Sequence, residues 1–172
     1  MLAPGLRRFA LTIHIIASVG WVGAVAGFLA LAIAGLVSAD VELVRASYVA
    51  MDFIYRTVVI PCGLVSLITG VVSSLGTDWG LLRHYWIVVK LLLTVPAVWL
   101  MLVHIQPVRY AAHVASAATV AGADLDGLRS QLVLYAVTAL AVLLTATALS
   151  IYKPRGRTRY GVRKSPGRTT LL

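Results

Sequence analysis

Four charged or imidazole side chains interrupt otherwise apolar stretches of the sequence, and these are the residues best suited to do chemistry. They are His14, Arg56, Lys90 and His104. A charged side chain at the centre of a membrane helix costs about 2.5–3.5 kcal/mol on insertion scales, so such a residue is a functional candidate by default. A neutral imidazole can bind a metal or a haem iron. A lysine between helices can serve as a ligand, a proton carrier or the partner of a propionate.

The spacing of these residues predicts two polar layers joined by one helix face. The third apolar stretch carries a series of residues at steps of four and three, which is the period of one helical face: Lys90, Thr94, Ala97, Met101 and His104. Asp52 precedes Arg56 by four residues, an ion-pair spacing on a helix. We therefore expect an inner layer with His14 and Lys90, and an outer layer with Asp52, Tyr55, Arg56 and His104.

The composition indicates what kind of structure holds these residues in place. The chain has 172 residues, of which 60% are hydrophobic and 12% charged, with a net charge of +9. A soluble domain is roughly 45–50% apolar and about 25% charged, so a soluble enzyme or a nucleic-acid-binding domain is excluded. A membrane helix needs about 20 apolar residues, so a chain of this length has room for roughly four membrane-spanning helices. The one cysteine, Cys62, permits no internal disulfide.

We predict an all-α, polytopic membrane protein with an antiparallel bundle of four transmembrane helices. The spans are expected at about 9–37, 53–75, 84–107 and 128–152. The first is too long for the hydrophobic region of a cleavable signal peptide, which has about 7–15 residues. The third is expected to end at Pro107, because proline cannot continue a helix. Segment 108–127 either extends the third helix or lies along the surface.

The basic residues predict the orientation of the chain in the membrane. Arg7 and Arg8 precede the first span, and the tail 153–172 is basic and expected to be disordered. The outer connections carry acidic residues, namely Asp40, Glu42, Asp124 and Asp126. Lysine and arginine favour the cytoplasmic side, so both termini are predicted to be cytoplasmic. The tail then sets topology and touches anionic lipid rather than nucleic acid.

Small and polar residues at helical spacing mark the faces on which the spans should pack. Membrane helices associate through such residues because leucine gains little against lipid tails. The first span has Gly20, Gly23, Ala24 and Gly27; the second has Gly63, Ser66, Gly70 and Ser73; the fourth has Gln131, Tyr135, Thr138 and Thr145.

Three classes of function are compatible with these residues. A haem held by two histidines needs both at one depth, and His14 and His104 are expected on opposite halves, so a haem would have one histidine ligand. The second class is a copper-handling or transport protein. Copper(I) favours sulfur ligands, and Met51, Met101 and His104 are the candidate copper ligands at the outer end. The third class is a non-catalytic accessory subunit of a larger membrane complex. His84 is expected at the membrane–water interface. His113 lies in the outer connection, and its role is left open.

Short motifs in the first three spans resemble a known family. His14-Ile15-Ile16 followed by Trp21 and Gly23, the Tyr48/Met51/Tyr55 series leading into Ile60-Pro61-Cys62-Gly63, and Trp86-Ile87-Val88-Val89-Lys90 carry the resemblance. They are similar to HemJ-type protoporphyrinogen oxidases, small four-helix proteins of bacterial inner membranes related to the copper resistance protein D group. The resemblance implies bound haem b, with His14 and Lys90 as the functional residues. Arg56 and His104 are further candidates for contacts with a cofactor, and a porphyrin or quinone is a candidate partner. The protein could also form homo-oligomers.

Overall fold

The computed structural model describes residues 3–75, 85–116 and 126–152, and these are almost entirely helical, with no strand among them. The elements are α1 (Pro4–Val37), α2 (Val41–Ile54), the π-helical turn η1 (Tyr55–Val59), α3 (Ile60–Leu75), α4 (Tyr85–Val103), α5 (Ile105–Ser116) and α6 (Asp126–Tyr152). Within the described residues, four segments are long and apolar enough to cross a membrane: Pro4–Val37, Val41–Leu75, Tyr85–Ser116 and Gly127–Tyr152. The prediction of an all-α four-helix membrane protein is confirmed. His84 and the tail 153–172 lie outside the described residues.

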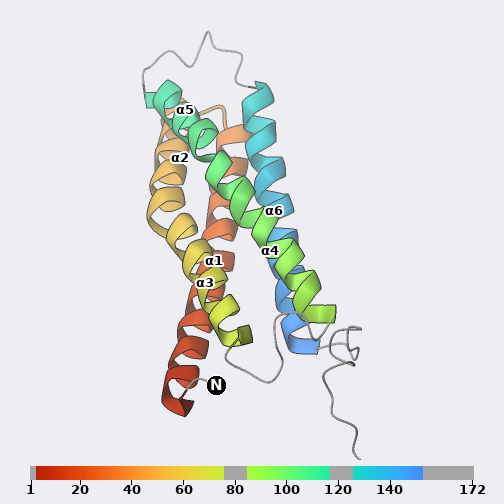
Figure 1. The fold of residues 1–172 in the computed structure, drawn as a ribbon. Coiled ribbons are helices and arrows are strands. Elements are labelled where there is room, and N and C mark those ends of the chain that lie inside the picture. Colours follow the sequence, from red (N-terminus) through yellow and green to blue (C-terminus); the bar gives the residue numbers. More distant parts are fainter. Residues whose placement is uncertain (1–2, 76–84, 117–125, 153–172) are drawn as a thin grey trace, which may run out of the picture.

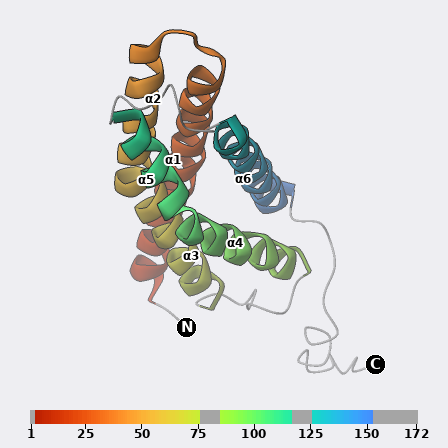
Figure 2. The same ribbon diagram turned by 90° about the horizontal axis from the view of Figure 1, so that it is seen from above.

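The four segments run antiparallel, as Figure 1 shows. Segments α1 and α4–α5 ascend from the end that carries the N-terminus, whereas α2–α3 and α6 descend towards it. We call the half that holds the start of α1 the lower half, and the half that holds α2 and α5 the upper half. α5 packs on α2, whereas α4 diverges from the α2–α3 segment and reaches α6 (Figure 2). This divergence opens the lower half of the bundle between α3 and α4.

The second segment begins at Val41, well before the predicted start at residue 53. Asp40 caps α2, because its side chain accepts a hydrogen bond from the backbone N–H of Glu42 at 3.0 Å. An acidic side chain in the first turn, Glu42, also suits the positive end of a helix. The prediction followed hydropathy, which does not register the polar Arg45 and Asp52 as parts of the same helix.

Proline 107 bends the third segment instead of ending it, so the predicted end at this residue is wrong. α4 stops at Val103, four residues before Pro107, and α5 starts at Ile105 and continues to Ser116. A proline ring clashes with the carbonyl four residues earlier, which is that of Val103, and lacks the N–H that would bond to it. Pro107 itself stands in the first turn of α5, where a proline is tolerated. Segment 108–127 therefore extends the third helix as far as Ser116.

Pro61 acts in a similar way on the second segment. Because Pro61 has no N–H, it cannot bond to the carbonyl four residues earlier, which belongs to Thr57 inside the π-helical turn Tyr55–Val59. A π-helical turn is a common way for a helix to absorb such an interruption. The turn lets α2 run into α3 as one continuous segment.

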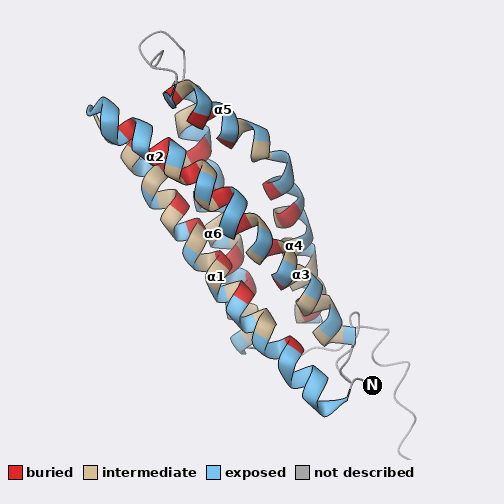
Figure 3. Ribbon diagram, turned by 90° about the vertical axis from the view of Figure 1, so that its left-hand side faces the viewer, coloured by how far each residue is buried: buried red, intermediate tan, exposed pale blue. Residues whose placement is uncertain are grey.

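The hydrophobic core is concentrated in the upper half. Figure 3 shows buried residues along the inward faces of the upper helices and few towards the start of α1. The buried cluster includes Trp21, Phe28, Tyr48, Met51, Tyr55, Met101 and Leu132. The rings of Phe28 and Tyr55 lie 5.5 Å apart between centroids. The upper half is therefore the part of the bundle that packs like a protein interior.

The predicted packing faces have different outcomes. On α3 the prediction is confirmed, because Gly63 and Ser66 are buried and Gly70 lies against α1. On α1, a side-chain carbon at Gly23 or Gly27 would meet nothing within 4 Å, so this pair makes no close contact within the bundle.

On α6 the prediction is correct for Tyr135, whose ring contacts that of His104, and wrong for Gln131 and Thr145. The buried residues of this helix are Leu132, Ala136, Leu143 and Ala146, whereas Gln131 and Thr145 are exposed. The hydroxyls of Thr138 and Thr145 each donate to the backbone carbonyl four residues earlier, at 2.8 Å. A threonine satisfied by its own helix can face lipid, so its polarity does not mark a contact between helices.

Candidate functional site

A cavity of about 830 Å³ occupies the lower half of the bundle, between α1, α3, α4 and α6. This volume lies within the range of about 300–1,000 Å³ that is usual for small-molecule and cofactor sites. Its lining is mostly apolar, with a minority of polar side chains that include His14, Ser18, Lys90, Thr94, Thr147 and Ser150. We call it the lower cavity.

His14 on α1 projects into the lower cavity with a defined orientation. Its Nδ1 lies 3.0 Å from the backbone carbonyl of Ser66 and 3.2 Å from the Thr69 hydroxyl. A carbonyl oxygen only accepts, so Nδ1 carries the proton and donates it. The Thr69 hydroxyl already donates to the carbonyl of Val65 at 2.6 Å, which leaves its oxygen free to accept. In the neutral ring, Nε2 then keeps a lone pair, and no described residue bonds to it.

Small residues on α3 make room for this imidazole. A side-chain carbon at Gly70 would lie 3.0 Å from Cε1 of His14, closer than most real contacts. One turn along each helix, the hydroxyls of Ser18 and Ser66 bond to each other at 2.7 Å. The polar stripe of α3 therefore fixes the position and the tautomer of His14.

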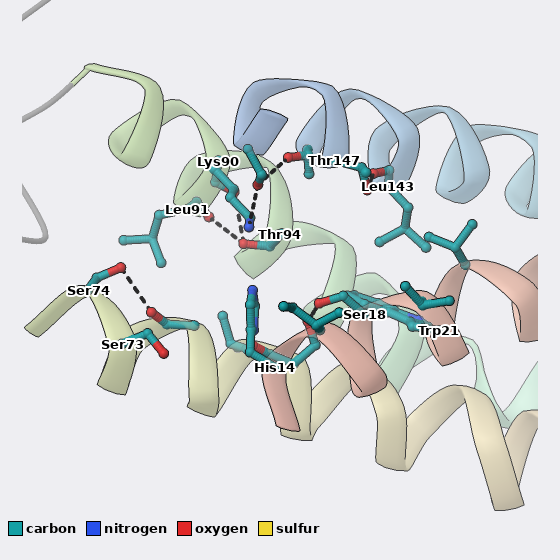
Figure 4. A pocket seen from close by; sticks show the side chains of 18 of the residues that line it. His14, Ser18, Trp21, Ser73, Ser74, Lys90, Leu91, Thr94, Leu143 and Thr147 are labelled. Atoms are coloured by element: carbon teal, nitrogen blue, oxygen red, sulfur yellow. Dashed lines mark hydrogen bonds between the residues drawn. The ribbon is translucent and has the colours of Figure 1, made fainter. Parts of the chain in front are cut away.

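Lys90 reaches the same cavity from the opposite wall. Its Nζ donates to the hydroxyl of Ser150 on α6 at 2.8 Å, and that hydroxyl donates in turn to the carbonyl of Ala146 at 2.9 Å. Figure 4 shows the His14 ring and the Lys90 amine pointing towards each other across the cavity.

The charge of the lower cavity is one-sided. Arg7, His14 and Lys90 line it, and the described lining includes no aspartate or glutamate. Asp40 and Glu42 lie at the start of α2 and Asp52 in its last turn, and none of the three lines this cavity. An uncompensated cation in an apolar wall favours a ligand that brings a negative group.

A second, smaller cavity of about 260 Å³ lies in the upper half, and we call it the upper cavity. His104 and Met101 line it together with Tyr55 and Tyr135. The His104 ring stands edge-on to Tyr135, with centroids 3.9 Å apart, and its Nδ1 donates to the carbonyl of Leu100 at 2.6 Å. The Tyr55 hydroxyl donates to the carbonyl of Met101 at 2.6 Å.

The remaining outer-layer candidates are not part of either cavity lining. Asp52 and Arg56 form the expected ion pair one turn apart, but the Arg56 side chain is half exposed and faces away from both cavities. Met51 is fully buried in the core and does not line the upper cavity with Met101 and His104. Among the described residues there is no group of three histidine, cysteine, aspartate or glutamate side chains that could hold a metal ion.

The structure thus brings His14 and Lys90 together, as the comparison of their depths predicts, and places His104 apart from them. The predicted face of the third segment lines both cavities: Lys90 and Thr94 the lower one, and Ala97, Met101 and His104 the upper one. Sequence reasoning missed Ser150, the partner of Lys90. Its signal was a hydroxyl near the end of the fourth span, at the depth where the third span begins.

No protein-family model, no curated protein and no solved structure matches this chain. The chemistry of the site therefore rests on its own geometry.

Proposed function

We propose that the lower cavity is a haem b site in which His14 is the iron ligand and Lys90 assists redox or proton transfer. The observation that carries this proposal is the hydrogen bonding of the His14 ring. Its Nδ1 donates to a backbone carbonyl while Nε2 is left with a free lone pair at the cavity wall. Histidines that bind metals usually donate their other nitrogen to a carbonyl or carboxylate in this way, which fixes the ring and raises its basicity.

The cavity fits such a group in volume and in charge. Its walls are largely apolar, and Arg7 and Lys90 supply positive charge where propionates would need partners. The described lining offers no second histidine and no methionine or cysteine, so the iron would have one histidine ligand. When bound, haem b supplies a one-electron redox centre.

The protein's own residues would then bind, orient and exchange protons. Ser66, Thr69 and Gly70 hold the His14 ring in place. Ser150 holds Lys90, whose amine pairs with an acidic group or passes a proton to a bound molecule. If the site is catalytic, the resemblance of the sequence favours oxidation of a porphyrinogen as the reaction.

The proposed location is the cytoplasmic membrane of a bacterium, with both termini on the cytoplasmic side. Two observations on the described residues support this orientation. Arg7 and Arg8 are exposed at the lower end of α1, whereas Asp40 and Glu42 lie at the upper end, between α1 and α2. Basic residues favour the cytoplasmic side of a membrane.

The optical spectrum of the purified protein tests the haem proposal. We expect a Soret band in the wild type, its loss in His14→Ala, and its retention in the matched variant His104→Ala, which changes the other cavity. A thermal melt of each variant checks that the bundle is intact. A wild type without a Soret band, or a band that His14→Ala leaves unchanged, contradicts the proposal.

A further inference from the structure

We propose that the upper cavity binds the ring of a membrane-soluble quinol, through His104 and Tyr135. This site is separate from the proposed haem site and does not depend on it. Its volume of about 260 Å³ is less than a third of that of the lower cavity, which suits a single substituted ring and not a macrocycle.

The walls of the upper cavity are suited to a flat aromatic ring. Phe28, Tyr55 and Tyr135 contribute rings, and Trp21 and Leu143 line both this cavity and the lower one. Aromatic rings pack favourably edge-to-face or offset against another ring. The cavity lies within the apolar part of the bundle, so its ligand must be soluble in lipid.

Most hydrogen-bonding groups of the upper cavity favour a ligand that donates. His104 Nδ1 donates to the carbonyl of Leu100, so the neutral ring has only an acceptor left, at Nε2. The hydroxyls of Tyr55 and Thr138 already donate hydrogen bonds to backbone carbonyls, so only their oxygen lone pairs remain to accept one. Within the described parts of the chain, the Tyr135 hydroxyl makes no hydrogen bond, which leaves it free to donate or to accept.

A quinol meets this preference better than its oxidised form does, because a quinone can pair only with the Tyr135 hydroxyl as donor. The two hydroxyls of a quinol can donate to acceptors such as His104 Nε2, but a quinone carries only carbonyl acceptors. A buried acceptor facing another acceptor stays unpaired, which lowers affinity. We therefore expect the site to prefer the reduced form of the ring.

The test is a titration of the protein in lipid nanodiscs with decylubiquinol under anaerobic conditions, and in parallel with decylubiquinone. Nanodiscs without protein correct for partition into lipid. NMR of the histidine ring nitrogens follows the His104 Nε2 signal, which is assigned from its absence in His104→Ala. We expect the quinol to shift this signal and to bind about tenfold more tightly than the quinone, the effect of one hydrogen bond.

Variants separate this site from the rest of the molecule. His104→Ala and Tyr135→Phe should each weaken quinol binding about tenfold. Tyr135→Phe keeps the ring beside His104, so it tests the site even if His104→Ala does not fold. The matched control His113→Ala changes an exposed histidine of α5 and should bind like the wild type.

Three results would overturn the quinol site: no binding, equal affinity for the two oxidation states, or quinol binding that neither His104→Ala nor Tyr135→Phe weakens. His14→Ala, which removes the proposed haem ligand, should leave quinol binding unchanged. The quinol site and the haem site can therefore fail independently of each other.

Discussion

Tyr55 in the upper half of the bundle and the His14–Lys90 pair in the lower half use polar side chains in opposite ways. In the upper half, the Tyr55 hydroxyl is buried and ties η1 to α4 through the carbonyl of Met101. In the lower half, Nε2 of His14 faces an open cavity, and Lys90 has a hydroxyl, not a carboxylate, as its bonded partner. The Tyr55 hydroxyl therefore holds helices together, whereas His14 and Lys90 remain available for a ligand.

The divergence of α4 explains why one bundle has both a packed core and an open ligand cavity. The bend at Val103 keeps α5 packed on α2 and directs α4 towards α6. The upper half gains the packing that stabilises the fold. The lower half loses packing between α3 and α4, and the space that results is the lower cavity. Stability and haem binding are thus expected to respond to mutations in different halves.

The largest expected effect on stability is that of Tyr55→Phe. This change leaves the carbonyl of Met101 unpaired in the core, which costs about 1–3 kcal/mol. The control Tyr110→Phe alters an exposed tyrosine of α5 and should change the free energy of unfolding by less than about 0.5 kcal/mol. Unfolding in mixed detergent micelles measures both. Equal stabilities of the two variants would contradict a structural role for the Tyr55 hydrogen bond.

A pair of glycine substitutions should change stability in opposite directions. A side-chain carbon at Gly63 would lie 3.0 Å from the buried Trp21 ring and 3.1 Å from the sulfur of Met101. Overpacking there should outweigh the gain in helix propensity, so Gly63→Ala is expected to destabilise the protein by roughly 1 kcal/mol.

Gly23→Ala is the matched substitution on α1, where the added carbon meets nothing within 4 Å. Alanine favours a helix over glycine by up to about 1 kcal/mol, so this variant should be as stable as the wild type or slightly more stable. The same unfolding assay measures both variants. Destabilisation by Gly23→Ala that matches that of Gly63→Ala would show that the two halves do not differ in packing.

The smallest expected effect on stability is that of Lys90→Met. Replacing a partly buried cation by an apolar side chain of similar length is often neutral or stabilising. Ser150 keeps its own bond to the carbonyl of Ala146, so no polar group is orphaned. We expect the free energy of unfolding to change by less than about 0.5 kcal/mol, while the amount of haem retained on purification falls. A large loss of stability would instead make Lys90 a structural residue.

Helical period and span order were enough to predict much of the candidate site. The face from Lys90 to His104 follows from steps of three and four alone, and the shared depth of His14 and Lys90 follows from antiparallel order. Lysine and histidine in apolar spans are rare enough to be noticed in a sequence.

Other features depend on interactions that periodicity does not express. Pro107 acts on the carbonyl of Val103, so its effect appears four residues away from it, as a bend. The threonines of α6 bond to their own backbone, so their polarity misidentified the packed face of that helix. The lower cavity arises from the divergence of α4, which is a property of the assembled bundle and not of any one span.

Chemical rescue of His14→Gly tests the central claim most directly. This variant removes the imidazole and leaves space beside Gly70, so free imidazole should enter the lower cavity and bind in place of the side chain. We predict that the Soret band lost in His14→Gly returns when imidazole is added during purification, and that His104→Gly keeps its band without imidazole. A band that persists in His14→Gly without imidazole, or one that imidazole fails to restore in a variant that remains folded, would contradict the assignment of His14 as the haem ligand.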